Sequence, residues 1–241
     1  MRVLAVGAHP DDLEILCAGT LAKYVRLGHE VVMCHVSNGD KGHFHIPPQE
    51  LGQTRDREAE EAARVIGAKV IAMGFHDGEI YNDKENRLRF IDVVRQARPD
   101  VVITHHPEDY FCDHTVTSQL VLDATFLATV PHFKTENPAL EKIPPVYFMD
   151  TLVGVNFQPT DYVDISETIE IKLLMLTKHQ SQLTWLREHD NVDIVNLVTT
   201  VARFRGYQCG VQYAEAFSRY QVWGRIQPGG LLPQLGLESR L

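Results

Sequence analysis

The sequence has no long apolar run and no cluster of basic residues. None of its apolar stretches approaches the ~18 consecutive residues of a membrane-spanning helix, and residues 1–4 enter an apolar run without the basic region and cleavage site of a signal peptide. The net charge of -9 argues against a nucleic-acid partner, because phosphate binding needs a positive surface. We therefore expect a cytoplasmic protein that binds neither membranes nor nucleic acids.

The sequence is also poor in cysteine. Its four cysteines are scattered, and no two of them form a Cys-x-x-Cys pair. This excludes the common zinc sites built from paired thiolates, and it favours reduced thiols over disulfides. A metal ion in this protein would have to be bound by histidine and carboxylate side chains.

Such side chains are concentrated near the start of the chain. The apolar residues 3–6 are followed by Gly-Ala and then by residues 9–14, which read His-Pro-Asp-Asp-Leu-Glu. Polar loops at the carboxyl end of a parallel strand are where α/β sheets bind ligands. His9 and Asp12 are ligand types that suit zinc or ferrous iron. Two ligands leave the coordination incomplete, so we expect a third from another strand end.

The best match for the third ligand is His114. It closes the polar segment 110–114, which follows another short apolar run at residues 101–104. Together with His9 and Asp12 it gives two imidazoles and one carboxylate, the set expected of a catalytic site that keeps one position open for water. The sequence therefore predicts one bound Zn²⁺, with Fe²⁺ as the alternative ion.

Apolar runs alternate with segments of helical periodicity through the first half of the chain, and this alternation predicts parallel strands joined by helices. We expect an α/β fold, with a single Rossmann-like, doubly wound, mainly parallel sheet and helices on both faces. The domain should span residues 1–226, and residues 227–241 should form a tail that is either disordered or docked on a neighbouring subunit. The expected strands are 3–6, 31–36, 70–73, 101–104 and 146–149, and the expected helices are 14–27, 53–66, 88–97, 114–127, 169–179 and 192–204.

Several further short motifs occur in a fixed order along the chain. They are residues 37–42 (Ser-Asn-Gly-Asp-Lys-Gly), 55–58 (Arg-Asp-Arg-Glu), 179–182 (His-Gln-Ser-Gln) and 213–217 (Tyr-Ala-Glu-Ala-Phe). With the two polar segments above, this pattern resembles the LmbE-like, or PIG-L, deacetylases, which are zinc enzymes that remove the acetyl group from N-acetylglucosamine-type substrates. The resemblance extends from about residue 3 to about residue 217, and several independent motifs agree.

The resemblance implies a metal-dependent hydrolase that removes an acetyl group from the amide nitrogen of an N-acetylated amino sugar or its conjugate. It makes Asp11 the general base that takes a proton from water. The alternatives are a zinc-dependent hydratase or S-conjugate amidase of the same family, or a metal-binding or sugar-binding protein without catalysis. The presence of Asp11 argues against a protein without catalysis, because such a protein needs no base beside the metal. We expect a small N-acetyl sugar as substrate, and a homo-oligomer.

The resemblance also suggests three residues that bind substrate. Arg55 matches a position that contacts substrate oxygens, although it could instead be a solvated helix residue paired with an acid. Glu14 either contacts substrate, supports the site from behind, or complements the charge of a helix N-terminus. His179 is carried over more weakly, because a histidine at a helix end is ordinarily a surface residue.

One position departs from the family pattern. Many members have a histidine that stabilises the tetrahedral oxyanion where this chain has Phe111, and a phenyl ring forms no such hydrogen bond. His106 or His105 could replace that donor, or both could serve only to pack the loop. Asp113, beside the ligand His114, should either orient an imidazole or cap the following helix.

Overall fold

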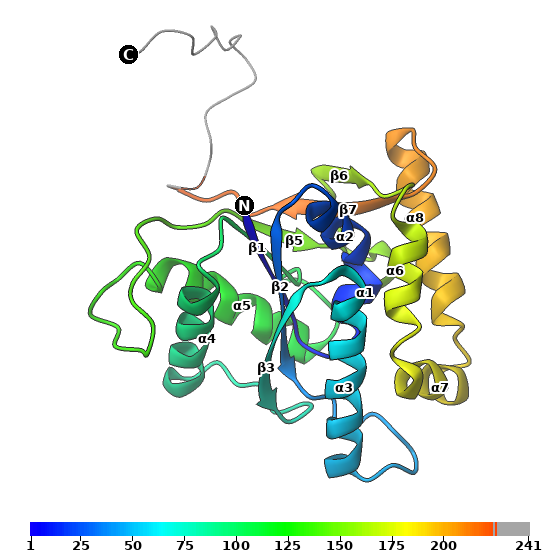
Figure 1. The fold of residues 1–241 in the computed structure, drawn as a ribbon, viewed down its shortest axis with the longest axis horizontal. Coiled ribbons are helices and arrows are strands. Elements are labelled where there is room, and N and C mark those ends of the chain that lie inside the picture. Colours follow the sequence, from blue (N-terminus) through cyan, green and yellow to red (C-terminus); the bar gives the residue numbers. More distant parts are fainter. Residues whose placement is uncertain (224, 226–241) are drawn as a thin grey trace, which may run out of the picture.

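The structure, a computed structural model, describes residues 1–223 and 225, which form one seven-stranded sheet in the order β3-β2-β1-β4-β5-β7-β6 (Figure 1). The strands from β3 to β5 in this order are parallel, and β7 is antiparallel to both of its neighbours. The expected mainly parallel α/β sheet is confirmed. The strands are β1 (Arg2–Gly7), β2 (Glu30–Ser37), β3 (Lys69–Phe75), β4 (Val101–Thr104), β5 (Val146–Met149), β6 (Asp161–Asp164) and β7 (Ala214–Arg219).

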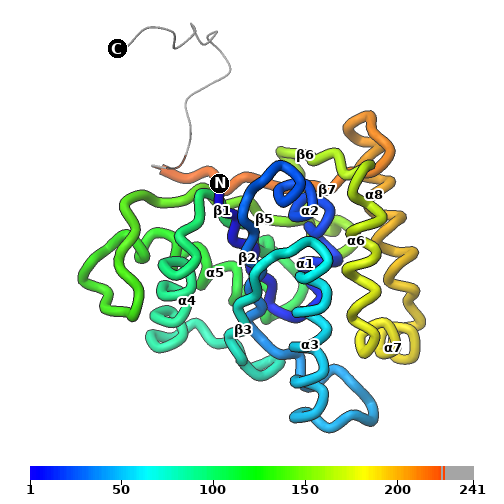
Figure 2. Tube along the Cα trace, in the orientation of Figure 1, coloured from blue at the N-terminus to red at the C-terminus, as the bar shows by residue number. Residues whose placement is uncertain are grey.

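Helices cover both faces of the sheet, as Figure 2 also shows. On one face α4 packs against α5, while α1, α2 and α3 pack with α6 on the other, and α8 packs against α6 and β7. No helix within the described residues is long and apolar enough to span a bilayer. The helices are α1 (Asp12–Leu16), α2 (Ala18–Arg26), α3 (Pro48–Ile66), α4 (Lys84–Ala97), α5 (Cys112–Leu127), α6 (Ile169–Leu176), α7 (Gln180–His189) and α8 (Ile194–Cys209), with a 3₁₀ turn at Leu152–Gly154.

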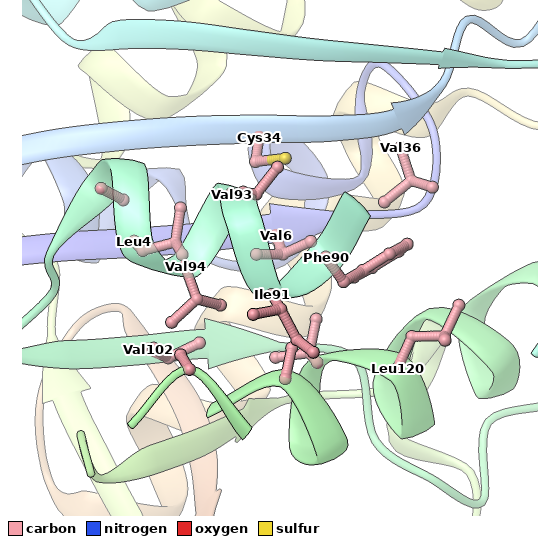
Figure 3. Close-up of a cluster of buried hydrophobic side chains, with 14 of the residues drawn as sticks. Leu4, Val6, Cys34, Val36, Phe90, Ile91, Val93, Val94, Val102 and Leu120 are labelled. Carbon is pink, nitrogen blue, oxygen red and sulfur yellow. The ribbon is translucent and has the colours of Figure 1, made fainter. Parts of the chain in front are cut away.

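The central strands are buried on both sides. In β1, Leu4 and Val6 contribute to the core under α4 and α5 (Figure 3), whereas Val3 and Ala5 contribute to the core on the opposite face. Each fully buried Leu or Val side chain stabilises the fold by roughly 1.5–3 kcal/mol relative to an exposed one. Burial on both faces explains why the strands appear in the sequence as continuous apolar runs.

The chain reverses its direction of winding between β1 and β4, which are neighbours in the sheet. The connection after β1 runs through α1 and α2 on one face, and the connection after β4 runs through α5 on the other. The two loops therefore diverge at the carboxyl ends of adjacent strands and leave a crevice between them, the usual ligand site of doubly wound sheets.

Two parts of the fold differ from expectation. The predicted helix 14–27 is broken at Cys17 into α1 and α2, because the buried carboxylate of Glu215 accepts hydrogen bonds from the Gly19 and Thr20 amides at the start of α2 (2.9 and 2.7 Å). Apolar periodicity continues across this break and gives no sign of it. The sequence also failed to predict β6, β7 and α7, and the predicted tail 227–241 lies outside the described residues.

Candidate active site

Three side chains from the two diverging loops meet at the crevice. His9 follows β1, Asp12 begins α1, and His114 lies in the first turn of α5. All three are buried, and their ligand atoms lie within 4.8 Å of one another. Asp12 Oδ1 is 3.3 Å from His114 Nε2, and Asp12 Oδ2 is 3.4 Å from His9 Nδ1. The structure thus brings together the three residues that the sequence singled out as metal ligands.

A carboxylate lies behind each imidazole of this group. Asp109 Oδ1 is 3.1 Å from His114 Nδ1, and Asp113 Oδ2 is 3.3 Å from His9 Nε2. One nitrogen of each ring therefore faces a carboxylate while the other faces Asp12. Metal-binding histidines characteristically have this arrangement, in which the outer carboxylate fixes the ring and raises its basicity. The residues present fit a divalent ion with mixed nitrogen and oxygen ligands.

Asp113 was expected either to orient an imidazole or to cap a helix. It contacts His9 and accepts a hydrogen bond from the Gly78 amide at 2.8 Å. The capping alternative is wrong, because Phe111 occupies the N-cap position of α5 and no side chain caps this helix. Asp113 is 1 % exposed and does not line the cavity, so it acts on the site by holding His9.

Sequence reasoning missed Asp77 and Asp109. Asp77 lies just after β3, and its Oδ1 is 3.1 Å from His9 Nε2. Both residues follow apolar strands, so the rule that identified His9 and His114 would also have identified them. The sequence does not show the path of each loop in space. This path decides which strand-end residues point into the crevice.

The acids and imidazoles of this group shift one another's pKa values. Burial lowers the pKa of His114, but the carboxylates of Asp12 and Asp109 outweigh it and raise the pKa to about 9. Burial raises the pKa of Asp12, whereas the surrounding imidazoles, His114 foremost, bring it well below its usual value. The group therefore holds positive charge firmly between its acids, and a divalent cation would compete with these protons for the same place.

Asp11 is directed into the same cavity by an unusual backbone conformation. Its φ of 126° lies in a region that side-chain-bearing residues rarely adopt. Arg55 holds the turn, because its Nη2 donates to the Pro10 carbonyl at 2.7 Å and to Asp11 Oδ1 at 3.0 Å. Gly39 leaves room for this guanidinium, since a Cβ there would lie 2.1 Å from Arg55 Nη1.

These surroundings also set the protonation of Asp11. Burial raises its pKa to about 6, although the nearby Arg55 charge acts in the opposite direction. A carboxylate with such a pKa is deprotonated at neutral pH and can still accept and return a proton, as a general base must. Arg55 is 3 % exposed, so the alternative of a solvated helix arginine is wrong.

The two histidines expected to replace the oxyanion donor lie elsewhere. His105 is fully buried beneath the site, where its ring stacks on His114 and its Nε2 lies 3.0 Å from Asp12 Oδ2. His106 packs edge-on against Phe148 and Phe157, and its Nδ1 accepts a hydrogen bond from the Glu108 amide at 3.2 Å. Neither lines the cavity. The structure therefore does not place His106 or His105 where a donor over the open metal position is required.

Glu14 and His179 form a pair inside the protein. His179 Nε2 is 3.4 Å from Glu14 Oε2, and both side chains are inaccessible to solvent. Neither residue lines the cavity, so the expectation that they contact substrate is not met. The pair lies close to Asp11. Burial raises the pKa of Asp11, and the charge of the His179 imidazole offsets part of this rise. The interpretation of His179 as an ordinary surface residue is wrong.

The cavity over these groups has a volume of about 510 Å³, within the usual range for small-molecule sites. Its residues come from the strand-end loops and the loop after β2, from α1, α3, α5, α7 and α8 and the residues beside them, and from the 3₁₀ turn. They are His9, Asp11, Asp12, Ile15, Lys41, Gly42, Arg55, Asp77, Gly78, Tyr110, Phe111, His114, Leu152, Gln182, Trp185, Leu186, Asp190 and Ile194.

Comparison with known proteins agrees with this geometry. Diacetylchitobiose deacetylase of Thermococcus kodakarensis is 28% identical over 224 residues, which cover 89% of this chain and 81% of the relative. The 4-oxalmesaconate hydratase of Pseudomonas putida is 26% identical over 182 residues, which cover 70% and 69% of the two chains. Among solved structures, N,N'-diacetylchitobiose deacetylase from Pyrococcus horikoshii, complexed with its inhibitor MPG, superposes with a TM-score of 0.80 at 26% identity, over 90% of this chain and 83% of that one.

The family model for GlcNAc-PI de-N-acetylase, PIG-L, matches residues 4–125, which is half of the chain. The matched segment contains both strand-end motifs, from His9 to His114. The chain therefore belongs to the PIG-L family.

Proposed function

We propose that this protein is a metal-dependent N-deacetylase that hydrolyses the acetyl amide of an N-acetylated amino sugar or its conjugate. One observation carries the proposal: the carboxylate of Asp11, with its pKa near 6, lines the same cavity as the two-histidine, one-carboxylate group. A protein that only binds a metal or a sugar has no need of a second, strained carboxylate there.

His9, Asp12 and His114 would hold the ion. Zn²⁺ suits this ligand set and Fe²⁺ is the alternative. When bound there, such an ion lowers the pKa of water toward ~7 and polarises the amide carbonyl. Asp109 and Asp113 keep the two imidazoles in place, which limits the reorganisation needed during the reaction.

Asp11 moves the proton. It takes one from the attacking water and returns it to the amine nitrogen as the carbon–nitrogen bond breaks. Arg55 fixes the carboxylate through Nη2, so a single oxygen of Asp11 is engaged by the guanidinium and the other is left for the reaction.

A hydrogen-bond donor is still needed for the oxyanion, and Tyr110 is the best candidate. It precedes Phe111 on the loop, lines the cavity, and is 71 % exposed. Its hydroxyl has no hydrogen-bond partner in the described part of the chain, so it is free to donate to the substrate. The pKa of Tyr110 is raised, because the surrounding protein excludes part of the water from its ring and the Asp109 carboxylate lies nearby, so its hydroxyl keeps its proton at neutral pH.

A second candidate function is that of a hydratase of the same family. Phe111 favours this alternative, because its phenyl ring forms no hydrogen bond to the oxyanion of amide hydrolysis. The charges in the cavity argue against it. A mesaconate-type substrate is a polyanion, and it would meet Asp11, Asp77 and Asp190. The cations of the cavity are already paired, Arg55 with Asp11 and Lys41 with Glu79 at 2.6 Å.

The test is amine release from N-acetylglucosamine and its glycosides by zinc-reconstituted protein. We expect turnover that is lost on chelation, restored by zinc, and absent from Asp11→Asn protein with equal metal content. Inactivity of the metal-loaded protein on every N-acetyl sugar, together with hydration of an unsaturated dicarboxylate, would contradict the proposal.

A further inference from the structure

The cavity has two chemically different regions. The metal end is formed by charged residues of the strand-end loops. Opposite them lies an apolar wall, which we define as the cavity-lining side chains of Ile15, Leu152, Trp185, Leu186 and Ile194. A site for a free amino sugar, which carries a polar group on nearly every carbon, has no evident use for so large an apolar surface.

The apolar wall is firmly supported from behind. Ile194 is 4 % exposed and belongs to a small core with Leu176 and Val198, against which Leu186 packs. This backing makes the wall a fixed surface and keeps it from collapsing into the cavity.

Trp185 is held equally well at the rim. Its ring stacks on His189 with centroids 4.3 Å apart, and Phe44 lies 4.5 Å away from it. The loop that carries Phe44 is also tied to α7 by a hydrogen bond from Gln182 to the Gly42 carbonyl (3.3 Å). A wall fixed in this way binds a ligand at little cost in side-chain entropy.

The polar groups beside the wall are largely engaged within the protein. Gln182 donates to Gly42, as described, and Asp190 Oδ1 lies 2.8 Å from His189 Nδ1. Lys41 and Arg55 are in the ion pairs described above. Few side chains remain to bind the hydroxyl groups of a second sugar.

Phe111 extends the apolar character to the metal end. It is 38 % exposed, lines the cavity, and contacts His9 and His114 with ring centroids 5.3 and 5.4 Å apart. A substrate whose amide lies at the metal group therefore meets apolar surface on two sides.

From these contacts we infer that the apolar wall binds an apolar group of the substrate, adjacent to the amide that is cleaved. The inference rests on the proposed function for the position of the amide. The apolar group has two possible sources, an aglycone on the sugar or an acyl chain longer than acetyl. A group the size of a phenyl ring gains roughly tenfold in affinity even when only part of its surface is buried.

The first experiment does not depend on turnover. Methyl and phenyl β-glycosides of glucosamine resemble the amine product and contain no amide, so their dissociation constants for the zinc-loaded protein can be measured by calorimetry. We expect the phenyl glycoside to bind about tenfold more tightly if the wall holds an aglycone.

The second experiment compares kcat/KM for N-acetylglucosamine and N-hexanoylglucosamine. A preference of similar size for the longer chain identifies the wall as an acyl site.

A pair of variants assigns the preference to the wall. Leu186→Ala should remove most of the preference for the phenyl glycoside over the methyl glycoside, whereas the control variant should keep it. The matched control is Leu174→Ala on α6, which shortens a leucine that is 49 % exposed and does not line the cavity.

The inference would be overturned if the two glycosides had equal dissociation constants and the two N-acyl sugars had equal kcat/KM. A preference that Leu186→Ala leaves intact would overturn it as well. A phenyl preference that Leu186→Ala removes, in a protein that hydrolyses no amide, would support the wall and contradict the proposed function, so the two failures are distinguishable.

Discussion

The metal end and the apolar wall of the cavity are built in opposite ways. At the metal end, short loops after parallel strands place acids and imidazoles close together, and each ligand histidine has a carboxylate partner. The wall comes largely from α7, α8 and the turn at Leu152–Gly154, beyond the parallel part of the sheet. On the proposed function, we expect the strand-end loops to set the reaction and the later elements to set the choice of substrate.

The comparison predicts that changes at the metal end affect every substrate equally. The largest effect should come from removing a ligand. His9→Ala and His114→Ala should lose most of their bound metal and all measurable turnover, because two ligands hold an ion poorly. Metal analysis of the purified proteins checks this, with the exposed His132→Ala as control. Full metal occupancy in either ligand variant would show that the ion binds elsewhere.

Next in size is the loss of the general base. Asp11→Asn should reduce kcat by roughly 10²–10⁴-fold and retain the metal, since Asp12 supplies the carboxylate ligand. Turnover at saturating substrate, measured together with metal content, separates the two roles. A parallel loss of metal would instead make Asp11 a ligand.

Tyr110→Phe removes the proposed oxyanion donor and should lower kcat by about 10²–10³-fold. The protein should remain as stable as before, because the hydroxyl has no partner in the described part of the chain. Phe111→His is the informative companion, since it restores the imidazole of the family pattern and should recover part of the lost rate in the double variant. An unchanged kcat in Tyr110→Phe would exclude this residue as the donor.

Gly39→Ala tests the support of Asp11 at a distance. The new Cβ would lie 2.1 Å from Arg55 Nη1 and displace the guanidinium, and a displacement of about 1 Å at a catalytic group can cost ~10²-fold in rate. Gly67→Ala is the control, because Gly67 has a similar φ of 71° but no atom within 4 Å of its added Cβ. Both variants place a side chain at a positive φ, and Gly39→Ala should lose more stability in thermal unfolding because it also displaces the buried Arg55. A similar loss of kcat in both variants would contradict the role of Arg55.

The smallest effect at the metal end should come from the outer carboxylates. Asp109→Asn leaves His114 without its charged partner and should weaken zinc binding by roughly 10–100-fold. Competition with a chelating dye measures this affinity, and the exposed neighbour Glu108→Gln serves as control. Equal affinities in the two variants would show that Asp109 is not needed to hold the ring.

The sequence predicted the parallel strands around the site and the three candidate ligands, for one physical reason. Strands buried on both faces leave clear apolar runs, and the loop that follows each run begins at the edge of the sheet. His9 and His114 could be located in this way without knowledge of any contact.

The direction of a side chain within a loop could not be predicted. His105 and His106 are neighbours, yet one ring lies beneath Asp12 and the other packs between Phe148 and Phe157. Loop length and composition are compatible with either orientation, and the choice depends on partners from distant parts of the chain. The same holds for Glu14, whose position on α1 was clear but whose partner is His179.

The late elements were missed for a related reason. The antiparallel strand β7 joins β5 and β6 through contacts that are remote in sequence, and its Glu215 breaks the first helix by binding the start of α2. Local propensity contains no trace of such a long-range hydrogen bond.

The central claim is that a divalent ion binds His9, Asp12 and His114. Among residues 1–223 and 225, two neighbouring groups also have suitable side chains, His105–Asp109–His114 and His9–Asp77–Asp113. Anomalous diffraction at the zinc edge from crystals of the zinc-loaded protein distinguishes all three. The account predicts one strong peak among His9, Asp12 and His114. A peak in either neighbouring group, with none among these three residues, would contradict it.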